Sequence, residues 1–313
     1  MTARRRSVAA FLLALAVLGC DGASAPTAPS ARAGSTAIAE ASIATQTSGK
    51  APAAAPNIPA TTADPRIEPS SVPSPAAVAA APKVLVGDGK WHTYTIAGHK
   101  LAIACSGRGT TPVILEHGIG YGVNSSSWPT VMNAVAKFAF VCRYDRAYTG
   151  RSEPATPGRS LGNLASDLRA LLRAAKIPSP YVLVAHSFGG ITTRYYAAAY
   201  PTEVAGLVLV DGTHQKFLGE FTLASERLSE SKVIADAKKL ASLGKRPLAV
   251  LTRGIGAGTR WQAAQKELAK LSTNAKQVIA TRSGHFIQTA QPDLVVSWTR
   301  RVLDAVRTGS SLK

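Results

Sequence analysis

The chain has 313 residues and carries 36 Lys and Arg against 18 Asp and Glu, which gives a formal charge of +18. Its residues are 46% hydrophobic and 17% charged, a composition that can bury a sizeable core and excludes a wholly disordered or fibrous protein. Three Cys are too few for a disulfide scaffold, and the length allows one large domain or two small ones. The basic charge is compatible with nucleic acid or an anionic membrane as a partner, and composition alone does not distinguish between the two.

The first 20 residues have the pattern of an export signal. Arginines at positions 4–6 precede an unbroken apolar run, Val8–Leu18, which is too short to span a bilayer. The segment Val17–Cys20 resembles the bacterial lipobox, in which the Cys thiol is acylated and becomes the first mature residue. The resemblance implies an exported lipoprotein, anchored through Cys20 to a membrane of the bacterial cell envelope. Cleavage of an ordinary signal peptide near Gly19 is the alternative, and it predicts a secreted or periplasmic protein.

Residues 21–82 have a different composition from the rest of the chain. Of these 62 residues, 44 are Ala, Pro, Ser or Thr, ten are Pro, and none is aromatic. Such a segment cannot bury enough apolar surface to offset the entropy lost on ordering it. We predict a disordered linker, and we place a single folded domain at residues 83–313. The ten prolines disfavour the alternative that part of the linker packs as an Ala-rich helix.

The domain that begins at residue 83 has the pattern of an α/β protein. Short apolar runs alternate with helical patterns, and they predict strands at residues 101–104, 112–115, 138–141, 181–184, 206–210, 247–251 and 277–280. Leucines at helical spacing predict a helix that ends near residue 176, with Ser160 as its N-cap, and Pro292 marks the start of another helix. Apolar strands separated by helices predict a largely parallel sheet covered on both faces.

Ser187 is the predicted nucleophile. The segment Tyr181–Gly190 indicates a buried strand, a sharp turn and the start of a helix that ends before Pro201. A nucleophile on such a turn needs very small residues two places away on either side, because the strand and helix backbones pass close together there. Ala185 and Gly189 meet that need. The alternative is that Ser187 only caps the helix.

Five segments in chain order resemble motifs of the α/β-hydrolase family. They are the His-Gly loop Glu116–Gly120, the turn Tyr144–Ser152 in which Tyr148 replaces a Gly, the turn around Ser187, the strand Leu207–Asp211, and Ser283–Phe286. The resemblance covers residues 91–307. It implies the α/β-hydrolase fold, with a mostly parallel central sheet of about eight strands, helices on both faces, and a short cap inserted at about residues 212–246.

The resemblance also implies a catalytic triad. His285 follows the last predicted strand, where the family places the base that activates the Ser. The loop at residues 251–259 has no Asp or Glu, so we assign Asp211, at the end of the preceding strand, to orient His285. A loop-capping role for Asp211 is the alternative, with Glu267 as the reserve acid.

The resemblance places an oxyanion hole beside the nucleophile. Two backbone N–H groups should bind the oxyanion, and we assign them to Phe188, which follows the nucleophile, and to Ile119 in the His-Gly loop. Their side chains then line the pocket.

The function expected from these residues is that of a serine hydrolase. A Ser nucleophile disfavours epoxide hydrolases and haloalkane dehalogenases, which resemble this fold but use Asp. We expect cleavage of a small ester or amide through an acyl-enzyme on Ser187, and peptidase and C–C hydrolase chemistry stay open. The missing acid at residues 251–259 motivates a competing hypothesis, a binding lipoprotein that kept the fold without catalysis.

No cofactor or metal is predicted, because no His or Cys cluster has metal-ligand spacing. Nucleic acid is not an expected partner either, because the chain lacks a basic and aromatic platform and carries an export signal. From Lys83 onward, 30 Lys and Arg face 14 Asp and Glu, a formal charge of +16. The excess charge therefore belongs to the folded domain, and it favours a position near an anionic membrane or envelope polymer.

Cys105 and Cys142 fall on strands that are neighbours in the family's sheet order. Export permits a disulfide between them. Two buried free thiols are the alternative, since free Cys is often buried and inert.

Overall fold

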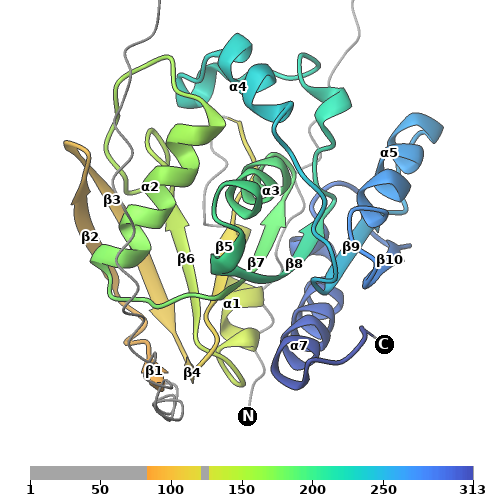
Figure 1. Cartoon of the computed structure of the whole chain (residues 1–313), viewed down its shortest axis with the longest axis horizontal. Helices are drawn as coiled ribbons and strands as arrows, with labels where there is room; N and C mark the ends of the chain where they lie inside the picture. The colour runs from red at the N-terminus through yellow and green to blue at the C-terminus, as the bar shows by residue number, and fades with distance from the viewer. Residues whose placement is uncertain (1–82, 121–126, 313) are drawn as a thin grey trace, which may run out of the picture. The chain divides into compact units, whose positions relative to one another are not determined.

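The computed structural model describes residues 83–120 and 127–312 of the chain (Figure 1). The predicted signal at residues 1–20, with Cys20, and the predicted linker at residues 21–82 lie outside the described residues. None of the helices within the described ranges is long and apolar enough to cross a membrane.

An eight-stranded sheet forms the centre of the domain, in the order β10-β9-β8-β7-β5-β6-β3-β2 (Figure 1). Strand β3 pairs antiparallel with both of its neighbours, and the other neighbouring strands pair parallel. The mostly parallel sheet predicted from the sequence is confirmed. The strands are β2 (Trp91–Ile96), β3 (His99–Ser106), β5 (Val113–Glu116), β6 (Val141–Asp145), β7 (Tyr181–His186), β8 (Val204–Val210), β9 (Leu248–Arg253) and β10 (Ala275–Ala280), and a separate pair is formed by β1 (Leu85–Val86) and β4 (Arg108–Gly109).

One predicted strand was wrong in its position. The apolar run at residues 138–141 predicted a strand, but β6 begins only at Val141 and continues through Asp145. The N–H groups of Phe138 and Ala139 donate to the carbonyl of Val135, so these residues close the turn at the end of α1. Their apolar side chains still pack into the core, which is why hydrophobicity alone did not distinguish turn from strand.

Helices cover both faces of the sheet, as predicted. Helices α2, α3 and α5 contribute to the apolar core on one face, and α1, α6 and α7 contribute to the core on the other. The helices are α1 (Pro129–Val135), α2 (Leu161–Ala174), α3 (Gly189–Ala199), α4 (Glu230–Ala237), α5 (Thr259–Ala269), α6 (Ile287–Ala290) and α7 (Pro292–Thr308).

The two helix starts predicted from the sequence are confirmed. Ser160 caps α2: its side chain accepts a hydrogen bond from the Asn163 N–H, and the Asn163 side chain accepts one from the Ser160 N–H. Helix α7 begins with Pro292, which has no N–H and loses nothing in the first turn of a helix.

A small cap connects β8 to β9. It contains the 3-10 turns η3 (Gln215–Phe217) and η4 (Ala224–Glu226) and the helix α4, which lies at the top of the view in Figure 1. Leu223 and Val233 of the cap are buried against Phe188 and Ile191 at the start of α3. The cap therefore packs directly on the segment that carries Ser187.

Cys105 and Cys142 form a disulfide. They are direct partners in the register of the antiparallel pair β3 and β6. Of the two alternatives left open by the sequence, the structure has the bonded pair.

Candidate active site

Ser187 lies on a sharp turn between β7 and α3. Its φ angle is 53°, in the left-handed region that L-residues rarely adopt. A Cβ atom on Gly189 would lie 2.7 Å from the carbonyl oxygen of His117, and one on Gly190 would lie 2.9 Å from the Cα of Gly212. The close approach of these backbones explains why positions 189 and 190 are glycine, and it holds the hydroxyl at the carboxyl end of the sheet.

The structure brings Ser187, His285 and Asp211 together in one hydrogen-bond chain. His285, in the loop between β10 and α6, has its Nε2 2.9 Å from Ser187 Oγ. Its Nδ1 lies 2.6 Å from Asp211 Oδ2. Because a carboxylate only accepts, Nδ1 carries the proton and Nε2 is free to accept one from the Ser hydroxyl. This is the geometry that a general base requires.

Asp211 is fully buried at the end of β8 and accepts further hydrogen bonds. The indole N–H of Trp261 donates to Oδ1 at 2.8 Å, and the backbone N–H of Arg253 donates to the same oxygen at 3.1 Å. The Arg253 guanidinium lies 3.4 Å from Oδ2 and 4.5 Å from the centre of the Trp261 ring. These partners offset the cost of burying the charged carboxylate.

Trp261 and Arg253 were not predicted from the sequence. Trp261 lies on α5, 50 residues after Asp211, and no motif marks it. Arg253 ends β9, and only the parallel pairing of β8 with β9 brings it to Asp211. Glu267, the reserve acid, instead has its carboxylate 2.7 Å from Lys216 Nζ and 3.3 Å from His214 Nε2.

Ile119 and Phe188, the residues assigned to the oxyanion hole, flank the nucleophile. Phe188 follows Ser187 at the amino end of α3, where free N–H groups favour negative charge. Ile119 lines the same cavity as Ser187, and a Cβ on its neighbour Gly118 would lie 3.0 Å from Ser187 Cβ. Within the described ranges, neither the Ile119 N–H nor the Phe188 N–H donates a backbone hydrogen bond.

Two buried histidines support the site without touching the Ser hydroxyl. His186 donates from Nε2 to the backbone carbonyl of His285 at 3.0 Å, and burial lowers the pKa of His186 to about 3. His117 donates from Nδ1 to the carbonyl of Gly118 at 2.7 Å, and burial also holds the pKa of His117 well below its ordinary value. Both rings are therefore neutral and fix the loops that carry His285 and Ile119.

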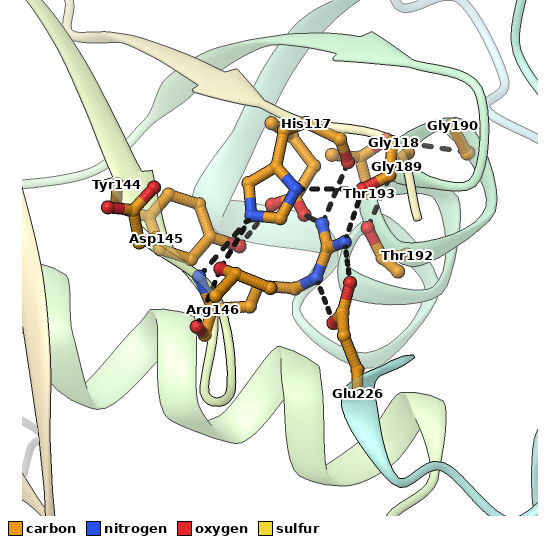
Figure 2. Close-up of polar contacts among 12 residues, drawn as sticks. His117, Gly118, Tyr144, Asp145, Arg146, Gly189, Gly190, Thr192, Thr193 and Glu226 are labelled. Atoms are coloured by element: carbon orange, nitrogen blue, oxygen red, sulfur yellow. Dashed lines mark hydrogen bonds and ion pairs between the residues drawn. The ribbon is translucent and has the colours of Figure 1, made fainter. Parts of the chain in front are cut away.

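A buried arginine lies behind the His-Gly loop. Figure 2 shows the Arg146 guanidinium between Glu226 of the cap and the backbone of His117 and Gly118. Its Nη1 also donates to Glu116, whose carboxylate accepts a hydrogen bond from Tyr144 as well. Burial works against the charge of Arg146, but the carboxylates of Glu226 and Glu116 outweigh it and hold the arginine pKa above its ordinary value.

A cavity of about 580 Å³ opens over the Ser hydroxyl. Phe217, Phe221 and Trp261 give it aromatic walls, and Arg260, ion-paired with Glu220, lies at its rim. The volume suits a small molecule, and the mixture of apolar walls with a few polar groups is typical of ligand sites. No group of His, Cys, Asp and Glu that could hold a metal ion occurs within the described part of the chain.

Comparison with known proteins identifies the fold. A family model described as the alpha/beta hydrolase fold matches residues 111–237. A thermophilic esterase from Thermogutta terrifontis superposes with a TM-score of 0.55 at 17% identity, over 69% of this chain and 99% of the esterase. The protein has the alpha/beta hydrolase fold. The epoxide hydrolase CorEH also superposes on this chain, with a TM-score of 0.56 at 17% identity, over 72% of this chain and 100% of CorEH.

A curated relative is similar to about two thirds of this chain. The uncharacterized protein YqjL of Bacillus subtilis is 27% identical over 223 residues, which span 65% of this chain and 88% of YqjL. Because an esterase and an epoxide hydrolase share the hydrolase fold, the fold alone does not name the reaction.

Proposed function

We propose that the protein is a serine hydrolase that cleaves an ester or amide bond of a small molecule through an acyl-enzyme on Ser187. The observation that carries the proposal is the hydrogen-bond chain from Asp211 through His285 to Ser187, which ends in the cavity. The nucleophile position holds Ser, which can form an ester with the acyl group of the substrate.

The first half of the reaction transfers the acyl group to the enzyme. Ser187 Oγ attacks the carbonyl carbon, and its proton moves to His285 Nε2. The oxyanion that forms is stabilised by the N–H groups of Ile119 and Phe188. When the bond to the leaving group breaks, the leaving alcohol or amine takes the proton from Nε2, and the acyl group remains on Oγ.

The second half releases the acid. A water molecule gives a proton to His285 Nε2 and attacks the acyl carbon, and Ser187 Oγ leaves with that proton. Throughout both halves, Asp211 keeps the imidazole in the correct tautomer and stabilises its positive charge without taking the proton. Trp261 and the backbone of Arg253 also donate to the Asp211 carboxylate and hold it in position.

The proposal is tested with short p-nitrophenyl esters. We expect the purified protein to hydrolyse p-nitrophenyl acetate or butyrate and Ser187→Ala to lose this activity. Ser297→Ala, which removes an exposed hydroxyl on α7, is the matched control and should keep wild-type turnover. Hydrolysis retained in Ser187→Ala would contradict the proposed mechanism.

The alternative of a binding protein without catalysis has less support. It was motivated by the absence of an acid at residues 251–259, and Asp211 supplies a carboxylate to His285 at 2.6 Å. A folded wild-type protein that binds a small ester and leaves it intact would favour this alternative.

For the cellular location, we propose export and anchoring through a lipid on Cys20. The lipobox-like sequence and the basic charge that begins at Lys83 support this proposal. We expect Cys20→Ser to move the protein from the membrane fraction to the soluble fraction of an expressing bacterium, without loss of hydrolase activity. Unchanged membrane association of Cys20→Ser would contradict a lipid anchor.

A further inference from the structure

We infer that Arg146, held by Glu226 of the cap, is a positioning residue that sets the orientation of the oxyanion-hole peptide between Gly118 and Ile119. The inference rests on the proposed function, because the Ile119 N–H acts only if an oxyanion forms. It assigns a role to the buried ion pairs behind the His-Gly loop, which take no direct part in the steps above.

The contact with the peptide is direct. Arg146 Nη2 donates to the carbonyl oxygen of Gly118 at 2.7 Å, and Nη1 donates to the carbonyl oxygen of His117 at 2.8 Å. In a planar trans peptide the C=O and the N–H point in opposite directions. Fixing the Gly118 carbonyl toward Arg146 therefore fixes the Ile119 N–H on the opposite side, away from the guanidinium.

The arginine also acts electrostatically on this peptide. A hydrogen bond from a charged donor is stronger than one from a neutral donor, and it polarises the carbonyl that accepts it. A polarised Gly118 carbonyl makes the Ile119 N–H of the same peptide a stronger donor. His117 Nδ1 donates to the same carbonyl at 2.7 Å, so two donors hold it.

Glu226 holds the other edge of the guanidinium. The Nε of Arg146 donates to Glu226 Oε2 at 2.7 Å, and Nη2 donates to Oε1, so the pair is bidentate. The two side chains are 2% and 1% exposed, so neither charge has water as a substitute partner. Figure 2 shows Glu226 meeting Arg146 on the side away from the His117 and Gly118 backbone.

The arrangement links the cap to the oxyanion hole. Glu226 belongs to η4 in the cap, 80 residues from Arg146 along the chain, and the adjoining Leu223 packs in one cluster with Phe188, the other oxyanion residue. A cap displaced from this position would remove the Glu226 carboxylate and leave Arg146 with Glu116 and the carbonyls of His117 and Gly118. The oxyanion hole therefore has its competent geometry only with the cap in place.

The experiment compares Glu226→Gln with Glu203→Gln on a p-nitrophenyl ester. Glu226→Gln keeps the size of the side chain but removes its charge, so kcat should fall by about 10-fold to 100-fold, against about 10²–10³ for complete loss of an oxyanion donor. We expect KM to change by less than about 3-fold, because the ground-state ester does not carry the oxyanion charge. Glu203 is another buried carboxylate, paired with Arg169 and outside the cavity lining, so Glu203→Gln should keep kcat within about 2-fold.

A transition-state analogue separates positioning from general destabilisation. A trifluoromethyl ketone forms a hemiketal oxyanion on a catalytic Ser. Its inhibition constant should therefore rise in Glu226→Gln by the same factor by which kcat/KM falls. Glu226→Asp keeps the charge and shortens the side chain by one methylene. It provides the same two measurements if the Glu226→Gln substitution leaves Arg146 too poorly paired for folding.

The outcomes distinguish this inference from the proposed function. A folded Glu226→Gln or Glu226→Asp protein with wild-type kcat and a wild-type inhibition constant overturns the role of Arg146 and Glu226. A folded wild-type protein with no esterase activity and no affinity for the ketone overturns the proposed function, and this inference falls with it. An active wild-type protein, together with position-226 variants that lose kcat and ketone affinity, supports both the inference and the proposed function.

Discussion

Asp211 combines complete burial with four hydrogen-bond or ion-pair contacts, which come from His285, Trp261 and Arg253. Its φ angle of 46° is in the left-handed region, like that of Ser187. Strained backbone at two members of one hydrogen-bond chain indicates that the surrounding structure is organised to hold these side chains in place. The indole N–H of Trp261 is the partner that can be removed with least change of shape.

Trp261→Phe should lower kcat for a p-nitrophenyl ester by about 10-fold. The substitution removes the donor to Asp211 Oδ1, and a hydrogen bond to a charged group contributes about 1.5–3 kcal/mol. The phenyl ring still fills most of the space beside Phe217. Trp298→Phe on α7 is the control and should keep wild-type kcat. Equal kcat values in both variants would mean that Trp261 only forms a wall of the cavity.

Residue-scale prediction depends on short segments with a local pattern. Ser187 and His285 were proposed from the turn and the late Gly-His segment, and Asp211 because it ends a strand; the structure brings the three side chains within hydrogen-bond distance. Arg253 and Trp261 reach Asp211 only through strand pairing and helix packing, so no local pattern reveals them. The same applies to Glu226, whose partner Arg146 is 80 residues away.

At the scale of elements, the turn between β7 and α3 depends on how closely two segments approach. The backbone of α3 at Gly189 passes within contact distance of the loop that follows β5. The requirement for a small residue at this position is therefore a requirement of packing between elements. It is independent of the chemistry of the Ser hydroxyl.

Gly189→Ala should destabilise the fold and lower activity. The new Cβ would lie 2.7 Å from the His117 carbonyl oxygen and 2.8 Å from Glu116 Cγ, so α3 and the loop must separate. Overpacking of this kind costs about 1–3 kcal/mol, which lowers Tm by a few degrees for a domain of this size. Gly258→Ala, whose Cβ meets nothing within 4 Å, is the control for thermal unfolding. The same Tm for both variants would contradict this account of the turn.

The order and type of the central elements were predictable from the sequence, because the central strands are continuous apolar runs and the starts of α2 and α7 are marked by Ser160 and Pro292. The bounds of β6 were not, because Phe138 and Phe140 are apolar in a turn as they would be in a strand. The cap was expected from its length and apolar residues, but its contacts with Arg146 and Phe188 depend on how it folds over α3.

At the scale of the whole molecule, three buried histidines couple stability to pH. Burial lowers the pKa of His186 to about 3 and that of His214 to about 4, and it holds the pKa of His117 well below the ordinary value of 6.5. Between these values and pH 6.5, the unfolded chain binds protons that the folded protein does not. The free energy of unfolding must therefore rise with pH in this range and level off above it, as far as these groups are concerned.

We expect Tm to fall as the pH is lowered from about 7 toward about 4.5. Each neutral histidine contributes a slope of up to about 1.4 kcal/mol per pH unit. His214→Gln should reduce the slope by up to one histidine's share. Thermal unfolding at several pH values measures this directly. A Tm that stays constant or rises as the pH falls through this range would contradict the neutral state of the three histidines.

The net positive charge is also a property of the whole folded domain. The described domain carries most of the excess Lys and Arg, and the cavity over Ser187 has an aromatic wall with Arg253 and Arg260 beside it. These features define a basic protein with a small-molecule site, and the role of that site depends on whether Ser187 is activated.

Labelling with a fluorophosphonate probe tests this activation most directly. The reaction needs a nucleophilic Ser and an oxyanion hole, but it does not require the natural substrate to be known. We predict stoichiometric phosphonylation of Ser187, located by mass spectrometry of the digested protein, with none in Ser187→Ala and strongly slowed labelling in Asp211→Asn. A folded wild-type protein that stays unlabelled, or that is labelled at a different residue, would contradict the assignment of Ser187, His285 and Asp211 as a catalytic triad.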